Sequence, residues 1–204
     1  MSPSGFNRRR FLASSLAAGL SIAGAGSAAA MGLSPTLFER ARDELSRLGS
    51  SIPHRDFVGV CDFSAASRTP RFHLLHMDDG RISTFLVAHG RGSDPAHQGW
   101  VERLSNEVGS NASSAGAYRT GDHYAGRHGR SMRLDGLDAS NNNAEARAIV
   151  VHGAWYVSPN MVRDHGKLGR SEGCFAFSES DLTEVLEKLK PGRLLLAEKF
   201  RDRA

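Results

Sequence analysis

The stretch Ala146–His152, with the sequence ARAIVVH, is a short apolar run that is followed directly by Gly153. A run of this length with β-branched residues at its centre predicts a buried strand. A second apolar run, Cys174–Phe177, predicts another strand, and Gly173 precedes it. A histidine therefore lies at the edge of one predicted strand and a cysteine at the edge of the other, each beside a glycine.

Short apolar runs of the same kind recur through the chain. They predict further strands at residues 57–63, 71–77, 82–89 and 193–200. The Asp-Asp-Gly sequence at residues 78–80 predicts a hairpin turn between two of them. Residues 90–143 are rich in glycine, serine and asparagine but contain scattered aromatic and aliphatic residues, so we expect long ordered loops with short strands there.

Helical patterns flank these strands. Ser34 and Pro35 predict the start of an amphipathic helix that Gly49 ends, and residues 31–50 are expected to pack on the domain. Ser158 begins a predicted short helical turn, and residues 180–190 form a second amphipathic pattern. The sequence thus predicts one mainly β domain, residues 51–204, with a few peripheral helices.

Residues 1–30 have the pattern of an export signal. Three arginines at residues 8–10 precede an apolar run rich in alanine and glycine, which ends in Ser-Ala-Ala-Ala. Paired arginines before Phe11-Leu12 resemble a twin-arginine signal. Glycine and serine interrupt the run, and it is too short to span a membrane comfortably. We therefore expect a cleaved signal peptide, no stable membrane insertion afterwards, and delivery to the periplasm or cell envelope.

The charge balance argues against a nucleic-acid partner. The whole chain has 26 basic and 22 acidic residues, and three of the arginines lie in residues 1–30, which contain no acid. The remainder is left with 23 basic residues against 22 acidic ones, and no clustered basic face is visible. No histidine pair has the H-E-x-x-H spacing of a zinc peptidase, so no metal site is predicted.

The two cysteines have different surroundings. Cys61 lies within the apolar run 57–63, which predicts a small buried core residue. Cys174 and His152 have the chemistry of a nucleophile and its base, since a thiolate is the reactive form and an imidazole accepts its proton. Backbone N–H groups of Gly173 and Cys174 are candidate donors to a developing oxyanion. The sequence leaves open whether Cys61 and Cys174 form a disulfide.

His152-Gly153 followed by Ser171-Glu172-Gly173-Cys174 resembles the H-G…S-x-G-C signature of the YkuD-type L,D-transpeptidases. Most of residues 55–178 is similar to the murein L,D-transpeptidase catalytic domain branch. The similar segments, in order, are DFSAAS (62–67), RFHLLHMDDGRI (71–82), VAHGRGSD (87–94), SNEVGSNASSAGAY (105–118), YAGRHGRSMRLDGLD (124–138) and NNNAEARAIVVHGAWYV (141–157).

The resemblance implies a YkuD-like β-sandwich of mixed sheets and a cysteine acyltransferase that acts on peptidoglycan stem peptides. Cys174 would attack the carbonyl of the third stem residue, and His152, oriented by the carbonyl of Gly153, would move the proton. The acyl group would pass to an amine or, as in an L,D-carboxypeptidase, to water. No metal or organic cofactor is implied. Ser171, Gly173, Arg170, His123 and Tyr124 are the implied oxyanion or substrate contacts.

Two positions differ from the family pattern. Glu172 stands where many members have histidine, and Ala176 stands where arginine or asparagine is common. These differences favour an alternative, a catalytically degenerate domain that binds cell-wall peptide without turnover. A papain-like wall hydrolase fits less well, because in that class the cysteine precedes the histidine. His89 is predicted to be structural, and Arg147 to pair with an internal carboxylate.

Overall fold

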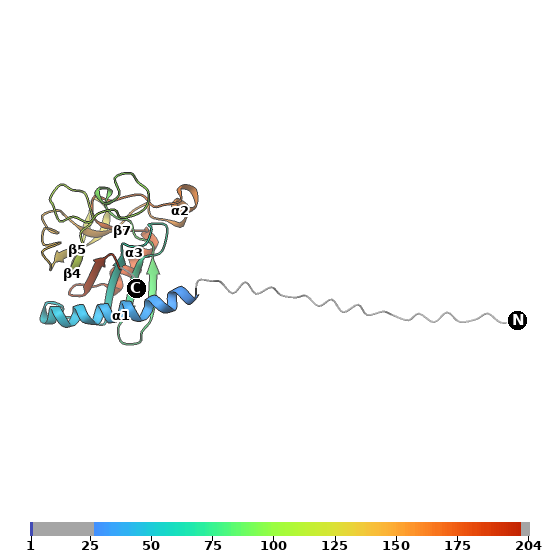
Figure 1. The fold of residues 1–204 in the computed structure, drawn as a ribbon, viewed down its shortest axis with the longest axis horizontal. Coiled ribbons are helices and arrows are strands. Elements are labelled where there is room, and N and C mark those ends of the chain that lie inside the picture. The colour runs from blue at the N-terminus through green and yellow to red at the C-terminus, as the bar shows by residue number, and fades with distance from the viewer. Residues whose placement is uncertain (2–26, 201–204) are drawn as a thin grey trace.

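The computed structural model describes residue 1 and residues 27–200 (Figure 1). Residues 2–26, most of the expected signal peptide, lie outside the described residues. The elements in chain order are α1 (Ser27–Leu48), η1 (Gly49–Ser51), β1 (Phe57–Asp62), β2 (Phe72–His76), β3 (Ile82–Phe85), η2 (Arg91–Ser93), β4 (Gly116–Gly126), β5 (Gly129–Gly136), β6 (Val150–Gly153), α2 (Pro159–His165), β7 (Phe175–Phe177), α3 (Glu179–Lys188) and β8 (Leu194–Glu198).

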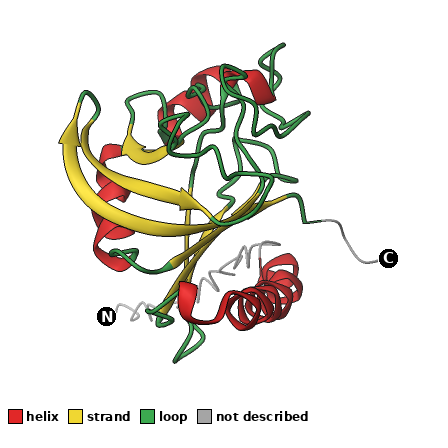
Figure 2. Cartoon of the chain, turned by 90° about the vertical axis from the view of Figure 1, so that its left-hand side faces the viewer, coloured by secondary structure: helices red, strands yellow, loops and turns green. Residues whose placement is uncertain are grey.

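The strands form one eight-stranded sheet in the order β3-β2-β1-β8-β4-β5-β6-β7. The pairs β1–β8 and β6–β7 are parallel and the other pairs are antiparallel. Figure 2 shows the strands bending strongly, with helices outside the sheet. The expected mainly β fold with mixed pairing and peripheral helices is confirmed, and all eight strands belong to a single continuous sheet.

Side chains alternate between the two faces of the sheet along β1 and β8, and a separate hydrophobic cluster lies on each face. Val58 and Val60 of β1 pair with Leu194 and Leu196 of β8, and all four are buried in the cluster that α1 covers. Cys61 points the other way and is fully buried in the cluster beneath α3, as the sequence predicts. Because successive side chains of a strand point to opposite faces, β1 and β8 each pack one set of side chains against α1 and the other set against α3.

Helix α1 begins earlier than its sequence signal indicates. The helix starts at Ser27, so Ser34 and Pro35 lie inside it and the predicted start is wrong. Its end agrees with the prediction, since α1 ends at Leu48 and Gly49 has a φ of +53°. Among the helices of the described residues, none combines the length and the apolar character needed to cross a membrane.

Residues 116–136 form a long hairpin where mainly loops were expected. β4 and β5 have 11 and 8 residues, and their inward side chains include Tyr118, Met132 and Leu134. The remainder of each strand is largely exposed and polar, so composition alone resembled a loop. The predicted strand 82–89 is shorter, ending at Phe85. The chain then crosses to the far edge of the sheet, where Ala88 bridges Ala176.

The packing of α1 gives a testable prediction. Leu37 is 2% exposed in the cluster between α1 and the sheet. We expect Leu37→Ala to lower the free energy of unfolding by about 2–5 kcal/mol, because it removes buried methyl groups and leaves a cavity. Denaturant unfolding measures this loss. Val108→Ala is the control, since Val108 is 62% exposed and should have little effect. Equal effects of the two substitutions would contradict the packing described.

Candidate active site

Cys174 and His152 lie on the same face of two neighbouring parallel strands. The register of β6 and β7 places Val151 beside Phe175 and His152 beside Ala176. Val151 and Phe175 point into the core beneath α3. Side chains alternate along a strand, so His152 and the residue before Phe175, Cys174, face the opposite way. Both line one cavity of about 210 Å³.

The ring of His152 is buried and held on two sides. Its Nδ1 lies 2.8 Å from the carbonyl oxygen of Gly153, which can only accept a hydrogen bond. Nδ1 therefore carries the hydrogen in the neutral ring, and Nε2 keeps its lone pair. The ring of His128 stacks on that of His152, with centroids 4.3 Å apart and planes 20° apart. The contact with Gly153 is the one that the sequence resemblance implies.

The pKa of His152 is lowered chiefly by burial, while the Gly153 carbonyl raises it and the neighbouring His128 and Arg127 lower it. The thiol of Cys174 shows the reverse shift. Burial raises the pKa of Cys174, against opposing effects of the Val150 N–H and of Arg127, and Glu172 raises it further. At neutral pH the pair is therefore a protonated thiol and a neutral imidazole. Such a thiol needs a base to become a nucleophile.

Ser171 pins the turn that presents the thiol. Its N–H donates to the carbonyl of His89 at 2.9 Å, and its carbonyl accepts from the N–H of Arg91 at 2.8 Å. Its hydroxyl donates to the Cys174 carbonyl at 2.7 Å and accepts from the Gly173 N–H at 3.2 Å. The Gly173 N–H, a predicted oxyanion donor, is thus hydrogen-bonded inside the turn in this structure. Ser171 acts as a brace for the turn.

Gly173 is required by this turn. Its φ of +119° is rarely adopted by other residues, and a Cβ there would lie 2.6 Å from Ile149 and 2.8 Å from the carbonyl oxygen of Ala112. The hydroxyl of Ser113 donates to the Gly173 carbonyl at 3.2 Å and accepts from the Gly90 N–H at 3.0 Å. The turn is therefore packed against two other loops without room for a side chain.

His89 belongs to a buried polar network behind the turn, in agreement with its predicted structural role. Arg71 donates to His89 Nδ1 at 2.7 Å, so Nε2 carries the hydrogen and faces Asp94 at 3.3 Å. Asp94 also accepts from the N–H groups of Gln98 and Gly99 at 2.7 Å each. All three charged or titratable side chains are at most 1% exposed. This network fixes the loop that carries the His89 carbonyl.

The side chains of Arg170 and Arg147 mainly donate hydrogen bonds to backbone carbonyls of loops. Arg170 lines the cavity, but its Nη1 donates to the carbonyls of Asp94 and Pro95. Arg147 donates to the carbonyls of Ser105 and Ala112. The expected internal carboxylate partner of Arg147 is wrong: within residues 36–200, the part with described side chains, it forms no ion pair. Backbone carbonyls of the loop that precedes β4 take that place.

His123 and Tyr124 are not among the residues that line the cavity. His123 pairs with Met132, whose side chain lies in the core on the other face of the sheet. Tyr124 pairs with Ser131 in line with His152, but the guanidinium of Arg133 lies over its ring, 4.6 Å from the centroid. The structure thus does not bring these two predicted contacts to the thiol.

Three other residues take their place in the lining. Arg127 and His128 form the turn between β4 and β5, and Tyr156 follows β6. Burial raises the pKa of Tyr156 to about 12, so its phenol remains a proton donor. A Cβ at Gly169 would lie 2.5 Å from Tyr156, so this glycine makes room for the ring. The available sequence signals were the Arg127-His128 pair between two glycines, which indicates a turn with exposed polar side chains, and Gly169, which leaves room for a neighbouring ring.

The two positions that differ from the family pattern have distinct surroundings. Ala176 is fully buried among Ala88, Ala154 and other apolar residues, and its carbonyl accepts from the Ala88 N–H at 2.9 Å. A long polar side chain does not fit there. Glu172 instead lies at the rim of the cavity, 3.1 Å from Arg91 and 3.5 Å from Arg127.

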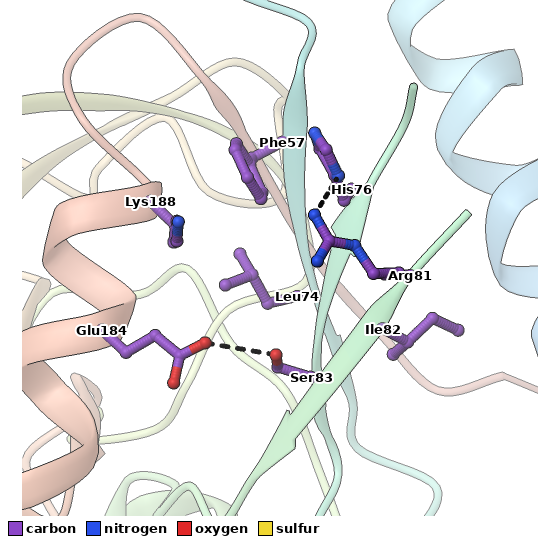
Figure 3. A pocket seen from close by; sticks show the side chains of 8 residues that line it. All are labelled: Phe57, Leu74, His76, Arg81, Ile82, Ser83, Glu184 and Lys188. Carbon is purple, nitrogen blue, oxygen red and sulfur yellow. Dashed lines mark hydrogen bonds between the residues drawn. The ribbon is translucent and has the colours of Figure 1, made fainter. Parts of the chain in front are cut away.

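A larger hollow of about 350 Å³ lies elsewhere, between α3 and the β2–β3 edge of the sheet (Figure 3). There the hydroxyl of Ser83 donates to Glu184 at 3.2 Å, and the Lys188 ammonium lies 5.3 Å from the centroid of Phe57. The lining of this larger hollow contains neither Cys174 nor His152. The smaller cavity, which contains both, is therefore the candidate active site. Among the described residues, no group of three or more histidine, cysteine, aspartate or glutamate side chains is placed to hold a metal ion.

A thiol and an imidazole thus line one cavity on one face of a mixed sheet, and the carbonyl of the next residue, Gly153, fixes the imidazole. The chain belongs to the L,D-transpeptidase catalytic domain family, whose family model matches residues 29–197. A search of curated proteins found no match.

Solved structures similar to this chain include three L,D-transpeptidases. The one from Mycobacterium smegmatis is 12% identical over 70% of this chain and 58% of its own, with a TM-score of 0.42. The one from Xylanimonas cellulosilytica is 16% identical over 70% and 60%, with a TM-score of 0.41. L,D-transpeptidase 1 from Mycobacterium tuberculosis is 12% identical over 70% and 61%, with a TM-score of 0.39. This chain therefore spans about three fifths of their length.

Both cysteines are free, and their burial predicts a difference in reactivity. In the folded protein we expect alkylation of Cys174 alone, because Cys61 is fully buried and burial raises its pKa to about 12. Since the pKa of Cys174 is itself raised, its alkylation rate should continue to rise above about pH 9. Peptide mapping after timed iodoacetamide treatment measures both. A rate that levels off below pH 8 would instead show a resting thiolate.

Proposed function

We propose that this protein is an exported cysteine acyltransferase that acts on peptidoglycan stem peptides, an L,D-transpeptidase with hydrolysis as a side reaction. The observation that carries the proposal is the arrangement of Cys174 and His152 on one face of β6 and β7, in one cavity, with His152 Nδ1 bonded to the Gly153 carbonyl. Membership of the L,D-transpeptidase catalytic domain family supports the substrate class. The arginine-led pattern of residues 1–30 supports export to the periplasm or cell envelope.

The first half-reaction forms a thioester. His152 Nε2 takes the proton of the Cys174 thiol while the sulfur attacks the carbonyl carbon of the third stem residue, the L-centre of an L,D bond. The N–H of Cys174 is the remaining backbone candidate to stabilise the oxyanion, since that of Gly173 is used by Ser171. Collapse breaks the peptide bond, and His152 returns the proton to the leaving amine of the terminal D-amino acid.

The second half-reaction transfers the acyl group. An acceptor amine attacks the thioester carbonyl, His152 takes a proton from that amine, and the Cys174 thiolate leaves and is reprotonated. Water in place of the amine gives hydrolysis. The neutral resting pair fits this sequence, because His152 is ready to accept a proton and the thiol carries the one to be moved. No step requires a metal or an organic cofactor.

Turnover of a purified disaccharide-tetrapeptide, followed by mass spectrometry, tests the proposal. We expect Cys174→Ala to abolish the reaction and His152→Gln to lower kcat/KM by about 10²- to 10⁴-fold, the usual contribution of general base catalysis. Cys61→Ala removes the other thiol and is the matched control, which should retain turnover. A carbapenem should add its mass to the wild type and to Cys61→Ala, and not to Cys174→Ala. Turnover that survives in Cys174→Ala would sink the proposal.

A catalytically degenerate domain that binds wall peptide is the second candidate. The departures at Glu172 and Ala176 favour it, because neither residue supplies the polar groups common at those positions. Binding of the tetrapeptide by the wild type, with neither products nor a carbapenem adduct at Cys174, would support this candidate over the enzyme.

The pH dependence of kcat/KM gives a further prediction. Activity requires neutral His152, whose pKa lies below its ordinary value, so the acid limb of the profile should fall below about pH 6.5. His128 lowers the pKa of His152, so His128→Ala should move the acid limb to higher pH. Arg119→Gln, at an exposed ion pair of the same hairpin, should leave the limb in place. No movement, or movement to lower pH, in His128→Ala would contradict the electrostatic assignment.

A further inference from the structure

The rim of the cavity carries more positive than negative charge. Arg127, Arg170 and Glu172 are the formally charged side chains in its lining. Glu172 lies 3.1 Å from Arg91 and 3.5 Å from Arg127, so one carboxylate bridges two guanidinium groups. The side chains remain accessible, at 56% for Arg91, 77% for Arg127 and 54% for Glu172. A second carboxylate can therefore reach the same pair of cations.

Arg127 is held close to the reacting groups. Its Nε donates to Nε2 of His128 at 2.8 Å, and the ring of His128 stacks on that of His152. Arg91 is also tied to this region, since its N–H bonds the Ser171 carbonyl within the turn that presents Cys174. The two arginines thus come from separate segments and meet at Glu172, the residue two before the thiol.

The proposed donor peptide carries a carboxylate near this point. The carboxyl carbon of a terminal D-amino acid is one residue beyond the carbonyl carbon that the thiol attacks, and one residue spans at most about 3.6 Å. A guanidinium pairs with a carboxylate through parallel hydrogen bonds. A ligand that pairs with both Arg91 and Arg127 therefore needs a carboxylate, the group with which Glu172 already bridges them. Arg170, one of the predicted substrate contacts, instead uses its Nη1 on loop carbonyls.

We propose that Arg127 and Arg91 bind the terminal carboxylate of the donor stem peptide, and that Glu172 occupies this site until the substrate displaces it. This inference rests on the proposed function. It gives Glu172 a part in specificity: its carboxylate competes with the substrate, and peptides that lack a free terminal carboxylate gain nothing from the two arginines.

The inference predicts opposite effects for the two kinds of substitution. Arg127→Gln should lower the preference for a free terminal carboxylate, by about 5- to 20-fold for a charge-assisted pair at an accessible site. Glu172→Gln should raise that preference by about two- to fivefold, because it removes an accessible ion pair that competes with the ligand. Arg91→Gln should act in the same direction as Arg127→Gln.

The experiment compares the disaccharide-tetrapeptide with the same compound carrying a C-terminal amide, and takes the ratio of their kcat/KM values. Arg119→Gln is the matched control, because Arg119 lies on β4 in an exposed pair with Asp135 and should leave the ratio unchanged. An unchanged ratio in both Arg127→Gln and Arg91→Gln would overturn the inference. A lower ratio in Glu172→Gln would do the same, since it would mean that the glutamate assists binding.

A second measurement separates this inference from the proposed function. Calorimetric titration of Cys174→Ala with the two peptides reports the carboxylate preference without turnover. The inference expects tighter binding of the free acid, a smaller difference when Arg127→Gln is added, and a larger one when Glu172→Gln is added. If the wild type turns over neither peptide but these differences appear, the enzyme proposal fails and the carboxylate site stands. Equal binding of acid and amide would refute the carboxylate site.

Discussion

β6 and β7 pair in parallel, with Val151 beside Phe175 and His152 beside Ala176, and the placement of the thiol and the imidazole in one cavity depends on this register. A shift of one residue would turn Phe175 out of the core and move the neighbouring cysteine to the opposite face. The register is enforced because Val151 and Phe175 are both fully buried. Burial of two apolar side chains on one face thus fixes the thiol and the imidazole on the other.

The turn before Cys174 holds the thiol in place at the start of β7. Ser171 bonds to His89, Arg91, Gly173 and Cys174, so four hydrogen bonds converge on one buried residue. The buried groups behind it are satisfied in turn, and no side-chain nitrogen or oxygen buried within the described residues lacks a partner. Such a network favours a single position of the sulfur, because any shift would leave buried polar groups unpaired.

The sequence pointed to the residues that carry distinctive chemistry, and it missed residues that line the cavity only because of how the chain folds. Cys174, His152 and Gly153 were marked by strand edges and a family signature, and they meet as expected. His123 and Tyr124 are not among the residues that line the cavity, and β4 has a register shift between Thr120 and His123 that no sequence pattern reveals. Arg127, His128 and Tyr156 reach the cavity because β5 pairs with β6, which brings the β4–β5 turn to His152, and because the chain after β6 also lines the cavity.

The amino-acid sequence by itself determined the mainly β class, the burial of Cys61 and the helix end at Gly49, and it singled out the thiol and the imidazole that line one cavity. These depend on local periodicity, on glycine conformation and on a short motif. Only the tertiary structure decided that the Gly173 N–H is used by Ser171, that Arg147 anchors backbone carbonyls, and that Glu172 bridges Arg91 and Arg127. The distances and orientations of the atoms in these contacts are set by the order of the strands in the sheet and by the packing of the loops. The spacing of residues along the chain does not encode either of them.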